Sequence, residues 1–256
     1  MIKPFVYGAL IGILGGLMGL GGAEFRLPVL TFIFDFTTLH AVIINLIVSW
    51  VTVIASLLFR WESWIAIEPY WHIVLTLLSG SLIGASMGAS LASRIDEQKL
   101  DRIVAVLLGI IALIMITETL TRFDPLGFNT ILMIFLGFGS GIIIGLFSSM
   151  LGVAGGELII PTIALLYGVD IKIAGTLSLM ISFPTIIVGL YRYRKREPFA
   201  IVKPNLSFIG SMASGSILGA WAGKSMLGWL SSSHLQIFLA LILSLSAIKL
   251  YKKGMQ

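Results

Sequence analysis

Two glycine-rich stretches interrupt apolar sequence in this chain. Residues 19–28 read GLGGAEFRLP and residues 152–161 read GVAGGELIIP, at an offset of 133 positions. Each contains glycines, a carboxylate and a final proline. Membrane helices normally avoid these residues, because they interrupt the backbone hydrogen bonds or leave charge in hydrocarbon. Two interrupted segments at matching positions of two halves are the best sequence indication of the binding site of a secondary transporter.

The composition is that of a membrane protein. The chain is 57% hydrophobic and only 11% charged, with a mean hydropathy of +1.03, which excludes a soluble globular domain. Apolar segments of about 20 residues, the length that crosses a bilayer, recur along the whole sequence. We predict an all-α polytopic protein embedded in the lipid bilayer, with segments at 5–34, 41–59, 71–92, 103–120, 131–167, 171–191, 206–230 and 235–250.

The net charge of +5 comes from basic residues in short loops between these segments. They gather at Arg192, Arg194, Lys195, Arg196 and Lys203, and again at Lys249, Lys252 and Lys253. This distribution follows the positive-inside rule of membrane proteins and does not indicate nucleic-acid binding. The chain has no cysteine, and no spacing of His, Ser, Asp or Glu indicates a metal site or a catalytic constellation. We therefore expect neither an enzyme nor a cofactor.

An internal repeat relates the two halves. When residues 8–57 are aligned with residues 141–190 without gaps, 13 of 50 positions are identical, including matched Gly, Glu and Pro. A second match, at an offset of 135, aligns Gly80, Gly84 and Gly88 with glycines at 215, 219 and 223. We predict two membrane repeats, residues 1–124 and 131–253. Small residues at every fourth position let helices approach closely, either within one chain or between chains of a homo-oligomer.

The topology depends on the two broken segments. If 5–34 and 131–167 each cross the bilayer once, 11 basic residues lie inside and five outside; if each folds back as a re-entrant hairpin, the numbers are 12 and four, Arg26 being left out of both. A single helix over 5–34 would be about 45 Å long, too long for one span. We favour the re-entrant arrangement. Both arrangements place the two termini in the cytoplasm.

The glycine stretches predict an anion site. A half-helix that begins near Glu24 or Phe25 directs its free N–H groups and the positive end of its dipole into the glycine turn. Arg26 has a planar fork that suits an oxyanion, although an ion pair with Glu24 is an equal alternative. Glu24 and Glu157 stabilise the helix start, carry a coupling proton or bind a coupling cation. The candidate substrate-binding residues are Gly21, Gly22, Ala23, Glu24, Arg26, Asn45, Ser49, Gly155, Gly156, Glu157, Thr176, Ser178 and Ser182.

These motifs resemble the TauE/SafE sulfite exporter family. The resemblance rests on the two glycine-to-proline stretches, on the Ala-Gly-Thr at 174–176, and on the glycines at 80, 84 and 88 followed by the charged turn at 94–97. It implies a secondary transporter in the cytoplasmic membrane. It further implies that alternating access moves a small sulfur-containing oxyanion, an organosulfonate or sulfite. An anion channel and a non-transporting assembly subunit are the alternatives.

Overall fold

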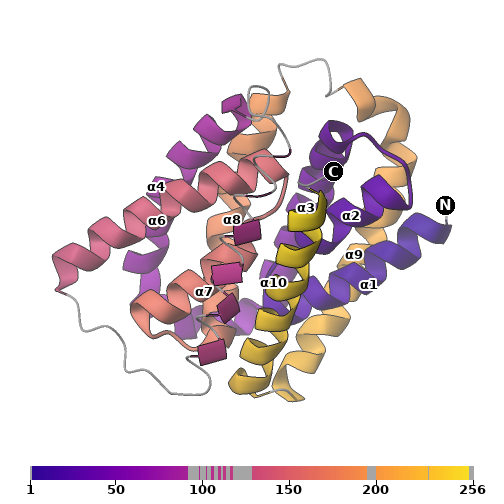
Figure 1. The fold of residues 1–256 in the computed structure, drawn as a ribbon. Helices are drawn as coiled ribbons and strands as arrows, with labels where there is room; N and C mark the ends of the chain where they lie inside the picture. The colour runs from indigo at the N-terminus through magenta and orange to yellow at the C-terminus, as the bar shows by residue number, and fades with distance from the viewer. Residues whose placement is uncertain are drawn as a thin grey trace.

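The computed structural model describes residues 2–91, 98, 102, 105–106, 109–110, 112–113, 116–117, 129–194, 200–229 and 231–253. The predicted segment 103–120, apart from isolated positions, and the linker at 122–127 lie outside the described residues. The described chain is helical almost throughout (Figure 1). Its elements are α1 (Ile2–Met18), α2 (Ala23–Phe32), α3 (Thr38–Phe59), η1 (Trp61–Tyr70), α4 (Trp71–Leu91), α6 (Thr130–Leu151), α7 (Gly156–Tyr167), α8 (Ile171–Tyr193), η3 (Lys203–Asn205), α9 (Leu206–Met226), η4 (Leu227–Trp229) and α10 (Ser232–Lys253).

Both glycine stretches break a helix, and the chain folds back at each break. Helix α7 returns along α6, since Tyr167 at its end donates a hydrogen bond to the carbonyl of Met133 at the start of α6 (3.1 Å). Helix α2 returns along α1 in the same way, because Phe34 just beyond its end packs edge-on against Tyr7 (ring centroids 5.8 Å apart). Each broken segment is therefore a helical hairpin, in which the second helix ends beside the start of the first.

The lengths of the helices fit this description. Four helices in the described part are long and apolar enough to cross a membrane: Leu39–Phe59, Trp64–Gly88, Thr130–Met150 and Ile171–Tyr193. Helices α2 and α7 have 10 and 12 residues, about 15 to 18 Å, which is too short to span the hydrocarbon core. The segments predicted at 206–230 and 235–250 form α9 and α10, whose 21 and 22 residues have the length of a span, but neither is among those four helices.

The small-residue faces bring helix backbones into direct contact. Helix α1 lies along α9 and α6 lies along α4 (Figure 1). A methyl group added at Gly12 of α1 would meet the backbone of Ser216 in α9. One added at Gly145 of α6 would meet the backbone of Ser81 in α4. These faces therefore pack within one chain.

The two helix pairs are built from positions that the predicted repeat equates. The pair Gly12 and Ser216 corresponds to the pair Gly145 and Ser81 at offsets of 133 and 135. Each pair joins a helix of one predicted repeat to a helix of the other, so the halves interlock rather than form separate lobes. At the centre, the ring of Trp50 in α3 stacks on that of Phe183 in α8, with centroids 6.1 Å apart and planes 12° from parallel. Trp50 and Phe183 are also 133 positions apart, as expected for residues on either side of a pseudo-twofold axis.

Matched glycine substitutions test this packing. The added methyl of Gly84→Ala would collide with the carbonyl of Ile142, and overpacking of this kind costs about 1–3 kcal/mol. Gly210→Ala is the control, because nothing lies within 4 Å of its added methyl group and alanine favours a helix by about 1 kcal/mol over glycine. We expect the melting temperature of the purified protein to fall in Gly84→Ala and to stay level or rise in Gly210→Ala. Equal melting temperatures for the two variants would contradict the packing argument.

Candidate functional site

The starts of α2 and α7 have the same local structure. Each helix is preceded by a glycine in the left-handed region, Gly22 with φ 74° and Gly155 with φ 79°. A residue with a side chain would be strained in this conformation. Neither helix start has a side-chain cap. The first N–H groups of a helix have no intrahelical partner, so both starts present backbone donors and the positive end of a helix dipole. The sequence predicted the first start near Glu24, and α2 begins one residue earlier, at Ala23.

The two breaks meet in the centre of the molecule. A methyl group added at Gly156 would lie 2.9 Å from Cα of Leu20, and one added at Gly21 would lie 3.4 Å from Cβ of Ala154. Residues 19–23 and 152–157 are all buried. The candidate glycines of the two halves are thus brought together, and in this conformation they pack directly against one another.

Arg26 in α2 is fully buried beside the first break. Its two terminal nitrogens donate hydrogen bonds to side chains of α3 and α9 and to a carbonyl of the break. These acceptors are Ser49 Oγ (2.8 Å), Asn45 Oδ1 (3.2 Å), Ser216 Oγ (3.2 Å), Gly21 O (3.4 Å) and Thr52 Oγ1 (3.5 Å). The candidates Gly21, Asn45 and Ser49 therefore surround one guanidinium group.

The second half has no cation at the matching position. Ile159 stands there and is 1% exposed. Where the guanidinium lies between Thr52 and Ser216 in the first half, the matching Thr185 and Ser81 are hydrogen-bonded directly to each other (2.8 Å). Equivalent Thr and Ser hydroxyls therefore bond to each other in the half that has Ile159, and they are separated by the guanidinium in the half that has Arg26.

Asn45 and Ser178 connect each half to the break of the other. The Asn45 amide donates to the carbonyls of Ala23 (2.9 Å) and Gly152 (2.8 Å). The hydroxyl of Ser178, its counterpart at the 133-residue offset, donates to the carbonyl of Gly19 (3.3 Å). Gly19 and Gly152 also correspond at that offset. The hydrogen bonds to Gly19 and Gly152 satisfy carbonyls that the helix breaks leave free inside a low-dielectric interior.

Arg60 and Tyr193 perform the same task at the ends of α1 and α6, and the sequence analysis did not select them. Arg60 is 1% exposed, and its Nη2 donates to the carbonyls of Gly16 (2.7 Å) and Leu17 (3.2 Å). Tyr193 is fully buried and donates to the carbonyl of Ser149 (3.0 Å). The 133-residue offset equates Arg60 with Tyr193 and position 16 with 149. Extending the alignment by three residues beyond position 57 would have paired Arg60 with Tyr193.

The remaining candidates divide into three groups. Glu157 lies in the first turn of α7 and is 3% exposed, where its carboxylate complements the helix dipole; the side chain of Glu24 lies outside the part that the structure describes. The buried hydroxyl of Ser182 has no hydrogen-bond partner among the described residues. Thr176 lies apart from Arg26 and accepts a hydrogen bond from Nη1 of Arg60 (3.2 Å).

Matched alanine substitutions test the connections across the halves. Asn45→Ala leaves the carbonyl of Gly152 in the second break without its donor, and removes one acceptor of Arg26 and an additional donor to the Ala23 carbonyl. Each buried group left unsatisfied costs about 1–3 kcal/mol. Ser178→Ala removes one longer hydrogen bond, of a kind that contributes about 0.6 kcal/mol in membrane proteins. We expect the melting temperature in detergent to fall several-fold more in Asn45→Ala than in Ser178→Ala. Similar losses in the two variants would contradict this ranking.

Comparison with known proteins agrees with this architecture. The chain matches the family Sulfite exporter TauE/SafE over residues 5–250. It is 26% identical over 268 residues to a "Probable membrane transporter protein" of Methanocaldococcus jannaschii, an alignment that covers 95% of this chain and 92% of the relative. No solved structure matches the chain. With the family match over nearly its whole length, this multi-pass helical membrane protein belongs to the TauE/SafE sulfite exporter family of membrane transporters.

Proposed function

We propose that the protein is a secondary transporter of a small sulfur-containing oxyanion, an organosulfonate or sulfite, and that the anion binds between the two helix breaks. The observation that carries this proposal is the meeting of the α2 and α7 starts at the centre, one turn from the buried guanidinium of Arg26. Backbone N–H groups at helix starts bind anions. The planar fork of arginine binds the oxygens of a tetrahedral oxyanion in pairs.

The partners of Arg26 support a role in binding. Five hydrogen bonds of its guanidinium go to neutral hydroxyl, amide or carbonyl oxygens. An oxyanion makes a charge-assisted hydrogen bond that is about twice as strong as one to a neutral acceptor. The anion therefore replaces some of these oxygens when the centre opens. The hydroxyl groups of Ser49 and Ser182 then become donors to the bound anion.

Alternating access follows from the interlocked halves. The breaks are held closed by Asn45 and Ser178, each of which reaches from one predicted repeat to the break of the other. Rocking of one hairpin together with its partner helix against the other such unit breaks one of these connections at a time and exposes the centre to one side. The Asn45 hydrogen bond to Gly152 (2.8 Å) is shorter than the Ser178 hydrogen bond to Gly19 (3.3 Å). The inward-open and outward-open states, which each break one of them, therefore differ in energy. Glu157 is the buried carboxylate in the described part through which a proton would couple to this motion.

We also propose the inverted topology with both termini in the cytoplasm. A hairpin enters and leaves the membrane on the same side. The start of α3 is therefore on the same side as the N-terminus, and the start of α8 is on the opposite side. Four basic residues then lie outside, Arg60, Arg122, Lys172 and Lys224, against 12 inside, as the positive-inside rule requires. The two helix breaks enter the membrane from opposite faces.

Single-cysteine variants test this topology, because the natural chain has no cysteine. Glu68 in η1 and Lys203 in η3 are both exposed. We expect a membrane-impermeant maleimide to label Glu68→Cys in intact cells and to label Lys203→Cys only after the cells are opened. If each broken segment crossed once, Glu68→Cys would also be protected until the cells were opened, and that result would overturn the inverted topology.

Substitution of Arg26 tests the site itself. Arg26→Ile introduces the residue found at the equivalent position 159, so Thr52 and Ser216 can bond directly as Thr185 and Ser81 do. We therefore expect this variant to fold. Hydrogen bonds to a charged group contribute about 1.5–3 kcal/mol each, so the loss of two reduces sulfoacetate or sulfite uptake into proteoliposomes more than 100-fold.

Two further results interpret the uptake measurement. Lys203→Gln, which changes an exposed lysine of η3 far along the chain from the breaks, is the control and is expected to retain wild-type uptake. A folded Arg26→Ile variant with wild-type uptake would contradict the proposed site. Wild-type flux that does not saturate and shows no counterflow would indicate an anion channel instead of a transporter.

A further inference from the structure

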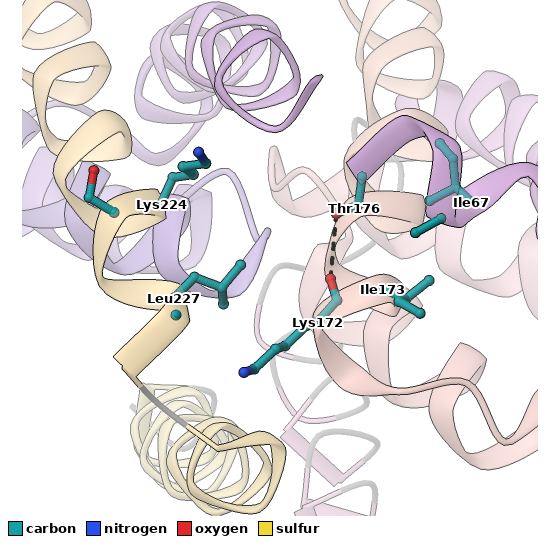
Figure 2. A pocket seen from close by; sticks show the side chains of 9 residues that line it. Ile67, Lys172, Ile173, Thr176, Lys224 and Leu227 are labelled. Atoms are coloured by element: carbon teal, nitrogen blue, oxygen red, sulfur yellow. Dashed lines mark hydrogen bonds between the residues drawn. The ribbon is translucent and has the colours of Figure 1, made fainter. Parts of the chain in front are cut away.

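A second basic site lies between the start of α8 and the end of α9. A cavity of about 420 Å³ opens between the start of α8, the end of α9 with η4, and η1. Figure 2 shows Lys172 of α8 and Lys224 of α9 on opposite walls of this cavity. Thr176 lies one helical turn beyond Lys172 on the same wall, and its hydroxyl is bonded to the Lys172 carbonyl (3.4 Å). The volume is within the range of small-molecule sites.

The positive charge at this cavity is unusual for its side of the membrane. In the proposed topology, the outer face carries only the four basic residues Arg60, Arg122, Lys172 and Lys224, since lysine and arginine are disfavoured in short outer loops. Arg122 lies outside the described residues. The other three line the cavity or lie directly behind its wall. In that topology, three of the four outer basic residues gather at one place and concentrate positive charge at this cavity.

The cavity is connected to a buried charge. Nη1 of Arg60 donates to Thr176 Oγ1 (3.2 Å), so this guanidinium lies one hydrogen bond behind the cavity wall. Arg60 is 1% exposed, and its Nε has no hydrogen-bond partner among the described residues. Its Nη2 holds the last carbonyls of α1 at the first helix break. Thr176 and Arg60 therefore link the cavity to the break through two successive contacts.

The acidic groups nearby belong to η1 and to the cap of α8, and none of them lines the cavity itself. Lys224 forms an ion pair with Glu62 of η1 (3.4 Å), with side chains 31% and 65% exposed. Exposed pairs of this kind contribute about 0–1 kcal/mol, so an incoming anion can compete with Glu62. Asp170 accepts a hydrogen bond from the backbone N–H of Lys172 as the cap of α8. Glu68 of η1 follows the lining residue Ile67 and is also acidic, whereas Lys172 and Lys224 are the charged residues that line the cavity itself.

We propose that this cavity is an outer vestibule that binds a free organosulfonate before or after it occupies the central site. The proposal rests on the proposed function and topology. The ammonium groups of Lys172 and Lys224 hold the sulfonate oxygens from opposite sides. Ile67, Ile173 and Leu227 supply apolar wall, which suits a ligand with a short carbon chain better than bare sulfite. The phosphate headgroup of an anionic lipid has the same oxyanion chemistry and is the competing source.

Equilibrium binding separates the vestibule from the central site. The probe is sulfoacetate, titrated calorimetrically into the purified full-length protein in a neutral detergent at low ionic strength. We expect the double variant Lys172→Gln/Lys224→Gln to bind at the vestibule at least tenfold more weakly, and Arg26→Ile to retain vestibule binding. The exposed lysine variant Lys203→Gln is the matched control and is expected to bind as the wild type does. Lys172 and Lys224 are partly exposed, so the double variant is expected to fold.

The outcomes distinguish failure of the vestibule from failure of the central site. Loss of all sulfoacetate binding in Arg26→Ile, or unchanged binding in the double lysine variant, would overturn the vestibule. Binding that survives Arg26→Ile in full and disappears in the double lysine variant would support the vestibule and contradict the central site. Phosphatidylglycerol in nanodiscs distinguishes the ligand source. If phosphatidylglycerol abolishes sulfoacetate binding even when sulfoacetate is in tenfold excess over the lipid, the cavity is a lipid site and the proposal is overturned.

Discussion

The structure depends on the requirement that every backbone polar group inside a membrane finds a partner within the protein. Breaking α1 from α2 and α6 from α7 leaves carbonyls and N–H groups without intrahelical partners in the interior. The protein satisfies the carbonyls with long or polar side chains from neighbouring helices: Arg60, Tyr193, Asn45 and Ser178. The N–H groups at the starts of α2 and α7 receive no side-chain cap. Satisfied carbonyls beside helix starts without a side-chain cap are the basis of the proposed anion site.

Close contact between the glycine faces of neighbouring helices holds the broken helices in place. Helices α1 and α9, and likewise α4 and α6, touch through their backbones, and each pair combines elements of both predicted repeats. Hydrophobic burial cannot drive helix association in lipid, so small residues and van der Waals packing must do so. The hairpins are therefore attached along their whole length to a helix of the opposite half. Movement of one hairpin must carry its partner helix with it, so each rigid unit combines elements of both predicted repeats.

Much of this was predictable from local sequence. The positions of the helix breaks, the glycine faces and the all-helical membrane architecture follow from residue type and spacing, because glycine, proline and charge have direct local effects on a membrane helix. Helix α2 begins at Ala23, next to Glu24, where the sequence predicted a start near Glu24 or Phe25. Arg60 and Tyr193 were missed, because an arginine at a helix end and a tyrosine near basic residues look like ordinary interfacial residues. Their function depends on carbonyls more than 40 positions away in the chain.

The sequence by itself determined where the helices break and which positions of the halves correspond, since both are read from matched Gly, Glu and Pro residues. Only the tertiary structure decided what those residues contact. It folded each broken segment back into a hairpin, brought the two breaks together, and placed Arg26 between two hydroxyl groups, of Thr52 and Ser216, whose counterparts in the other half bond directly to each other. It also put Thr176 beside a basic cavity, next to a glycine that packs against the first break. These outcomes depend on helix packing between segments far apart in the chain, which residue spacing within one segment does not specify.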